Sequence, residues 1–241
     1  GVKKGKGELY DYLKAHHGTA FVMVDYDYLK EMSSGIEHII SYGTREANLT
    51  GHVSKSEPFL SIELTHGSDI KIIHTQLTGD YNLTNVLAAV SVGNYFKVAA
   101  KKIKDSIENY APSNSRSQLI ERNSNKIILD AYNANPSSMS AAIRNLAAFH
   151  VNNKVLILGG MAELGAESLR EHENIISLIE KYPWNQVVLV GGDFLKIKHP
   201  YLSFENALQA RDWFQKQQFH DTYFLIKGSR SMQMEKVITS S

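Results

Sequence analysis

The second half of the chain repeats one pattern four times: a short apolar run followed directly by glycines or small polar residues. The runs cover residues 126–130, 155–158, 187–190 and 223–226. Segments with helical spacing separate them, at 136–149, 167–182 and 205–217, and a last helix is predicted from about residue 231. Buried strands that alternate with helices predict a mostly parallel sheet covered on both faces, and therefore an α/β fold.

The first half has a different texture. Residues 8–15 are typical of the end of a helix, and apolar runs at 20–24 and 38–42 predict buried strands. Apolar and polar residues then alternate from 49 to 77, which predicts antiparallel strands. Helical spacing returns at 83–90 and 99–110. Because 111–115 is the most linker-like stretch, we predict two domains, 1–113 and 114–241.

Composition excludes several classes of protein. The chain has 241 residues, 26 basic and 25 acidic, for a net charge of +1. A protein that binds nucleic acid mainly through phosphates needs a basic excess, so we expect no nucleic-acid partner. No apolar run approaches the ~20 residues that span a bilayer, so we expect no membrane association. Without cysteine there is no thiolate zinc site or cysteine nucleophile. The histidines have no zinc-site spacing, and GxGxxG is absent.

In an open α/β sheet, ligands bind beyond the carboxyl ends of the strands, where small residues let a ligand approach the backbone. Asp130 closes one buried strand, which is typical of a functional carboxylate, although it could instead hold the following loop. Lys227 and Arg230 flank Gly228-Ser229 before a helical segment. Together they could form an anion site, or they could be two solvated surface charges.

Three asparagines each allow a structural and a ligand-binding interpretation. Asn135 precedes Pro136, a pairing that caps a helix, and Asn135 could also line a site. Asn82 and Asn85 lie three residues apart and share a helix face. Two adjacent amides could recognise a planar donor–acceptor edge such as a purine, or Asn82 could simply be an N-cap and Asn85 part of a polar surface.

Several segments together resemble the Mur ligase family, and within it the branch that adds D-alanyl-D-alanine. The resemblance covers essentially the whole chain, and its most specific string begins at Asp130. Two positions depart from the family pattern: Tyr81 replaces a usual His, and Gly160 replaces a usual Asp. The matching strings are Lys6-Gly-Glu-Leu9, Asn82-x-x-Asn85-x-x-Ala88-Ala89, Arg116-Ser-Gln118, Asp130-Ala-Tyr-Asn133-Ala-Asn135-Pro136-Ser-Ser-Met139, Leu158-Gly-Gly-Met-Ala-Glu-Leu-Gly165 with Glu171-His172, and Lys227-Gly-Ser-Arg230.

The resemblance implies the end of a P-loop-type central domain with a mixed sheet, followed by a Rossmann-like domain. It also implies ATP and magnesium as cofactors. Lys6 would be a carbamylated lysine that binds magnesium and supports catalysis. Asn82 and Asn85 would face adenine, while Arg116 and Asp130 would reach the nucleotide from the second domain.

Asn133, Asn135, Lys227 and Arg230 would line the cleft where dipeptide and phosphates meet. The expected substrates are D-alanyl-D-alanine and a UDP-N-acetylmuramoyl-tripeptide, joined through an acyl phosphate by a cytoplasmic monomer. Gly1-x-x-x-Gly5-Lys6 is one residue too short for a P-loop. We therefore expect a fragment that cannot turn over alone. A non-catalytic nucleotide- or dipeptide-binding module and a folylpolyglutamate synthase-like ligase remain alternatives.

Overall fold

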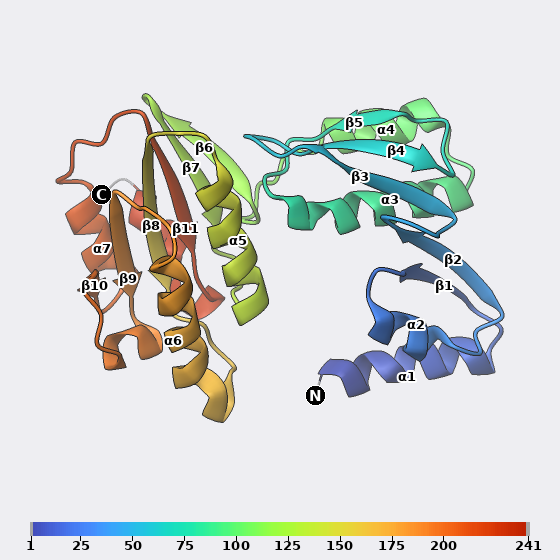
Figure 1. Cartoon of the computed structure of the whole chain (residues 1–241), viewed down its shortest axis with the longest axis horizontal. Coiled ribbons are helices and arrows are strands. Elements are labelled where there is room, and N and C mark those ends of the chain that lie inside the picture. The colour runs from blue at the N-terminus through green and yellow to red at the C-terminus, as the bar shows by residue number, and fades with distance from the viewer. Residues whose placement is uncertain (1, 240–241) are drawn as a thin grey trace. The chain divides into compact units, whose positions relative to one another are not determined.

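The computed structural model describes residues 2–239. The chain divides into two compact units, residues 1–76 with 80–110 and residues 77–79 with 111–241. The division after residue 110 lies three residues before the boundary that the sequence predicts. In Figure 1 the first unit runs from blue to green and the second from green to red.

The first unit is built on a sheet in the order β1-β2-β3-β4-β5. Strands β1, β2 and β3 are parallel, whereas β4 and β5 join in antiparallel register. Helix α3 packs on β1, β2 and β3. The elements are α1 (Val2–Ala15), β1 (Thr19–Met23), α2 (Asp27–Ser33), β2 (His38–Gly43), β3 (Leu49–Lys55), β4 (Ser61–His66), β5 (Ile72–His74), α3 (Leu83–Tyr95) and α4 (Ala100–Glu108).

Apolar periodicity explains the core of this unit. Leu60, Ile62 and Leu64 alternate along β4 and its approach, and all three are buried. The helical stripe that includes Leu87 and Val90 is buried on α3, so it faces the sheet. The first half therefore folds as its alternation and helical spacing predict.

The second unit is built on a sheet in the order β10-β9-β8-β11-β7-β6. Its strands are parallel, except that β6 runs antiparallel to β7 at the edge. The elements are β6 (Gln118–Arg122), β7 (Asn125–Asp130), α5 (Pro136–Ala148), β8 (Asn153–Gly159), α6 (Ser168–Ile179), β9 (Gln186–Val190), β10 (Leu202–Phe204), α7 (Ala207–Phe214) and β11 (Thr222–Lys227).

Both faces of this sheet are covered. Ile128 and Leu156 belong to a core shared with α5 and α6, which lie on one face of the sheet in Figure 1. Ile127 and Val155, their neighbours in sequence, belong to a second core shared with α7. Successive strand residues point to opposite faces, so continuously apolar runs fill both cores, as the sequence predicts.

The structure also differs from the sequence predictions. Helix α2 and strands β6 and β10 are additional elements, and β5 ends at His74, before the end of the alternating stretch at residue 77. The last helix, predicted from residue 231, is wrong. Two 3₁₀ turns, Arg230–Met232 and Met234–Ile238, replace it, because Gln233 between them has the left-handed φ of 51°. Across residues 2–239, no helix combines the length and apolarity that crossing a bilayer requires.

Candidate functional site

The carboxyl ends of three parallel strands in the second unit lie side by side. Asp130 ends β7 and is in register with Lys227, which ends β11. Lys227 is in turn in register with Leu158 near the end of β8. The structure thus brings the segments 131–135, 159–165 and 227–230 together at the carboxyl ends of the strands, and we call these segments the loop edge. They carry most of the candidate residues.

Lys227 and Asp130 form an ion pair inside this edge. Nζ of Lys227 lies 2.5 Å from Oδ2 of Asp130, and their side chains are only 2% and 13% exposed. Lys227 Nζ also donates to the backbone oxygen of Asn133, at 3.1 Å. The other oxygen of Asp130 accepts from the backbone N–H of Ser117, also at 3.1 Å. Lys227 is therefore not a solvated surface charge: it fixes Asp130 and the loop that follows.

Ser229 connects three of the loops at this edge. Its hydroxyl accepts from the backbone N–H of Ala162 at 2.7 Å and donates to the oxygen of Ala134 at 3.2 Å. Its own N–H donates to the oxygen of Gly160 at 3.1 Å. Because Ser229 is buried, these bonds hold the loops in one arrangement. Sequence reasoning gave Ser229 no role beyond being a small residue.

His172 holds the loop after β8 in place. Its Nε2 accepts from the backbone N–H of Met161 at 2.9 Å, and its Nδ1 donates to the oxygen of Ser168 at 2.7 Å. The ring is completely buried and packs edge-on against Phe194. Both ring nitrogens are engaged, so His172 supports the loop rather than facing a ligand.

Steric contact explains why position 160, where the family pattern has Asp, holds a glycine. A Cβ atom at Gly160 would lie 2.8 Å from the Cα of Gly192 and 3.3 Å from the oxygen of Gly191. The turns after β8 and β9 approach each other here, and Gly192 has a left-handed φ of 59°. With this backbone, no side chain fits at position 160.

Two arginines gather around one exposed ring at the same edge. Cζ of Arg116 lies 3.6 Å from the ring centroid of Tyr132, and Cζ of Arg230 lies 6.0 Å from it. Tyr132 is 43% exposed, and both arginines are exposed. Within residues 2–239, neither guanidinium forms an ion pair. This cluster of Arg116, Tyr132 and Arg230 offers an aromatic face with positive charge, a combination suited to a planar ring that carries phosphates.

Sequence reasoning selected both arginines but missed Tyr132. A signal was present, because Tyr132 lies inside the string that begins at Asp130. A tyrosine in a loop has many possible orientations, however, and only the structure shows the Tyr132 ring near both guanidiniums.

The side-chain oxygens of Asn133 and Asn135, in the same loop, both accept hydrogen bonds from backbone N–H groups. Asn135 caps α5: its side-chain oxygen accepts from the N–H of Ser138 at 2.9 Å, and Pro136 follows at the first helical position. The Oδ1 atom of Asn133 accepts from the N–H of Ala134 at 2.8 Å. Both asparagines are exposed, so each can present its amide N–H group to a ligand.

In the first unit, the predicted amide pair is directly bonded. Nδ2 of Asn85 donates to Oδ1 of Asn82 at 2.9 Å. Asn82 is 7% exposed, whereas Asn85 is exposed, and the side chain of Asn82 makes no capping bond to α3. The pair thus shares a face as predicted, but one amide points inward and supports the other.

Lys6 lies on α1 with an exposed side chain that carbon dioxide could reach. A carbamate there would supply oxygen ligands for a hard cation. Among the described residues, no group of three or more His, Asp or Glu side chains is placed to hold a metal ion. The side chains that the structure describes therefore form no complete magnesium site on their own.

Comparison with known proteins identifies the family. Residues 1–93 match the Mur ligase middle domain, and residues 115–230 match the Mur ligase glutamate ligase domain. Domains of this one family thus cover most of the chain, in the order that the resemblance implies. The chain belongs to the Mur ligase family.

Two similar curated proteins carry the same activity in their names. The UDP-N-acetylmuramoyl-tripeptide–D-alanyl-D-alanine ligases of Haemophilus influenzae and Escherichia coli are 30% and 29% identical to the chain. The matches cover 100% and 99% of the chain, but 54% and 55% of the two relatives. The chain spans about half the length of these relatives.

Solved structures agree on the fold. MurF from Acinetobacter baumannii superposes with a TM-score of 0.81 at 25% identity, over 99% of this chain and 55% of that one. MurF ligase from Thermotoga maritima in complex with ADP gives 0.77 at 19% identity, over 92% and 52%. Folylpolyglutamate synthase from Thermotoga maritima gives 0.59 at 15%, over 86% and 48%. The last two likenesses show the α/β fold alone, so they do not favour folylpolyglutamate chemistry.

Proposed function

We propose that this chain is part of an ATP-dependent amide ligase that joins D-alanyl-D-alanine to a UDP-N-acetylmuramoyl-tripeptide in peptidoglycan synthesis. The observation that carries the proposal is the loop edge of the second unit. Asp130 is locked in place there, and the Arg116–Tyr132–Arg230 cluster stands exposed. Relatives that align with the whole chain and carry this name support it.

The nucleotide is the ligand that this edge suits. A base or ribose can pack against the exposed ring of Tyr132, and the guanidiniums of Arg116 and Arg230 attract phosphate oxygens. Asp130 already accepts one hydrogen bond on each oxygen, yet a carboxylate has about four acceptor sites. It therefore keeps the capacity to accept a ribose hydroxyl, while Lys227 and Ser117 hold it in the correct orientation.

In the proposed reaction, ATP transfers its terminal phosphoryl group to the peptide carboxylate. The dipeptide amine attacks the acyl carbon, a C–N bond forms, the C–O bond to phosphate breaks, and phosphate leaves while the amine loses its proton. This chain's residues bind and orient the reactants: Arg230 near the phosphates, and the free amide N–H groups of Asn133 and Asn135 towards the dipeptide. Burial of Lys227 makes it a positioning residue in this scheme rather than a substrate ligand.

Magnesium fits the scheme only in part. A carbamate on Lys6 would add one anionic group from α1, and nucleotide phosphates would have to supply other ligands. A bound magnesium ion would neutralise phosphate charge. Since the described residues form no complete metal site, we assign no step to the metal.

Titration of the 241-residue protein with ADP, followed by NMR, tests the nucleotide assignment. We expect saturable binding that Tyr132→Leu weakens about tenfold, since base–aromatic stacking contributes about 1–3 kcal/mol. Tyr12→Leu is the matched control, because Tyr12 is an exposed tyrosine on α1. Equal affinities for the wild type and Tyr132→Leu, or equal losses in both variants, would refute the assignment.

A further inference from the structure

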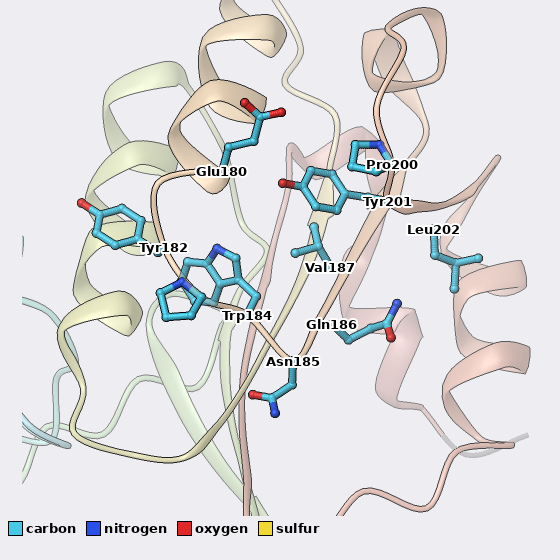
Figure 2. Close-up of a pocket in the computed structure, with 10 residues that line it drawn as sticks. Glu180, Tyr182, Trp184, Asn185, Gln186, Val187, Pro200, Tyr201 and Leu202 are labelled. Carbon is cyan, nitrogen blue, oxygen red and sulfur yellow. The ribbon is translucent and has the colours of Figure 1, made fainter.

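A hollow of about 480 Å³ opens in the second unit where β9 and β10 begin. Figure 2 shows its lining. The loop edge lies at the carboxyl ends of the parallel strands. The hollow lies at their amino ends, on the opposite side of the sheet. The five residues of β9, about 17 Å long at ~3.3 Å per residue, separate the hollow from the loop edge. The residues that line the hollow are Glu180, Tyr182, Pro183, Trp184, Asn185, Gln186, Val187, Pro200, Tyr201 and Leu202.

Aromatic rings form the walls. Figure 2 shows Trp184 and Tyr201 on two sides of Val187. Tyr182 meets the indole edge-on, with ring centroids 6.2 Å apart. Val187 is almost completely buried and forms the floor. A ligand that enters the hollow therefore meets aromatic surface on more than one side.

The walls are fixed before any ligand arrives. Nε1 of Trp184 donates to the backbone oxygen of Ile179 at 2.9 Å. Tyr201 stacks on His199, with centroids 5.9 Å apart and planes 24° apart. A proline, with its fixed φ, directly precedes Trp184 and Tyr201 in the chain. A ligand would pay little conformational entropy to order these two rings.

The hollow has one charge, and it is negative. Glu180 is exposed beside Tyr201 and forms no ion pair within residues 2–239. Burial, and then the carboxylate of Glu180, raise the pKa of the Tyr201 hydroxyl above its ordinary value. No lysine, arginine or histidine is among the described residues that line the hollow. The electrostatic preference is therefore for a positive group.

We propose that this hollow binds an alkylammonium group, through the faces of Trp184 and Tyr201 and the carboxylate of Glu180. Aromatic faces attract cations through their quadrupole, and tryptophan does so best. A neutral group of the same shape would gain the apolar contact but neither electrostatic contribution. The ammonium could belong to a free small molecule or to a lysine side chain of a peptide, since both present the same chemistry.

The test compares a cation with its neutral isostere. Choline and 3,3-dimethyl-1-butanol are titrated into the 241-residue protein, with Nα-acetyl-lysine methylamide as the peptide-borne ammonium. The indole N–H signal of Trp184 reports binding. Trp213, the other tryptophan, packs against Phe204 and Phe219 and serves as an internal reference. We expect at least one of the two cations to bind about tenfold more tightly than the alcohol. The tighter of the two identifies the source of the ammonium.

Two variants separate the site from general surface charge. Glu180→Gln should weaken binding of the cation about fivefold and leave the affinity for the alcohol unchanged. Glu173→Gln removes the same charge from an exposed position on α6 outside the hollow and should change neither. Equal affinity for cations and alcohol, equal effects of the two variants, or no shift of the Trp184 signal would each overturn the proposal.

Discussion

At the scale of single residues, two cations only three positions apart have different fates. Lys227 is buried against Asp130, whereas Arg230 is exposed beside Tyr132. Strand periodicity explains part of this contrast, because Lys227 is still the last residue of β11 while Arg230 lies beyond it. A buried cation must have its counter-charge, so Lys227 and Asp130 depend on each other.

This dependence predicts a large effect on stability. Lys227→Met should lower the free energy of unfolding by about 3–5 kcal/mol, because it leaves the Asp130 carboxylate buried without its partner. Urea denaturation measures the loss. Lys126→Met is the matched control: Lys126 lies on β7 and forms a partly exposed pair with Glu121 at 3.8 Å, so its loss should cost at most about 1 kcal/mol.

A second variant distinguishes charge from packing. Adding Asp130→Asn to Lys227→Met should recover part of the loss, because the double variant has no uncompensated carboxylate. If Lys227→Met costs no more than Lys126→Met, then Lys227 does not position Asp130 and its assigned role is incorrect.

Sequence reasoning selected most residues of the loop edge but not their interactions. The string after Asp130 and the Lys227–Arg230 segment both follow apolar runs, so their approach at one edge could be expected from a parallel sheet. Which cation turns inward, and that Ser229 and His172 hold neighbouring loops, depends on side-chain packing across segments distant in sequence. No local pattern encodes those contacts.

At the scale of elements, the parallel strands and the helices between them were the predictable part. Long periodic segments such as α5 and α6 carry their own signal, and β7, β8, β9 and β11 each contain a continuous apolar run. Short elements were missed because β10 has three residues and α2 seven. The predicted last helix was wrong because Gln233 adopts a left-handed conformation, which a glutamine in the sequence does not predict.

The contact between the turns after β8 and β9 leads to a prediction at this scale. Gly160→Ala should lower the free energy of unfolding by about 1–3 kcal/mol, because the new Cβ meets the backbone of Gly192 at 2.8 Å. Gly5→Ala on α1 is the control, since its Cβ would meet nothing within 4 Å. That change should stabilise the helix by about 0.5–1 kcal/mol. A neutral Gly160→Ala would show that the turns separate easily.

At the scale of the whole molecule, the chain matches the Mur ligase middle domain and glutamate ligase domain and spans about half the length of the relatives that align with all of it. The second unit holds its loop edge through bonds within itself: the Asp130–Lys227 pair, Ser229 and His172. Bonds within the second unit therefore organise this edge. We propose that the nucleotide binds at this prearranged edge.

Mapping the backbone amide shifts of the 241-residue protein during titration with ADP tests that claim most directly. We predict that the largest shifts in the second unit occur at residues 115–117, 130–135 and 227–230. Residues 180–187, at the opposite edge of the sheet, should stay unchanged. Shifts concentrated away from the three predicted segments, or no shift at saturating ADP, would contradict the claim.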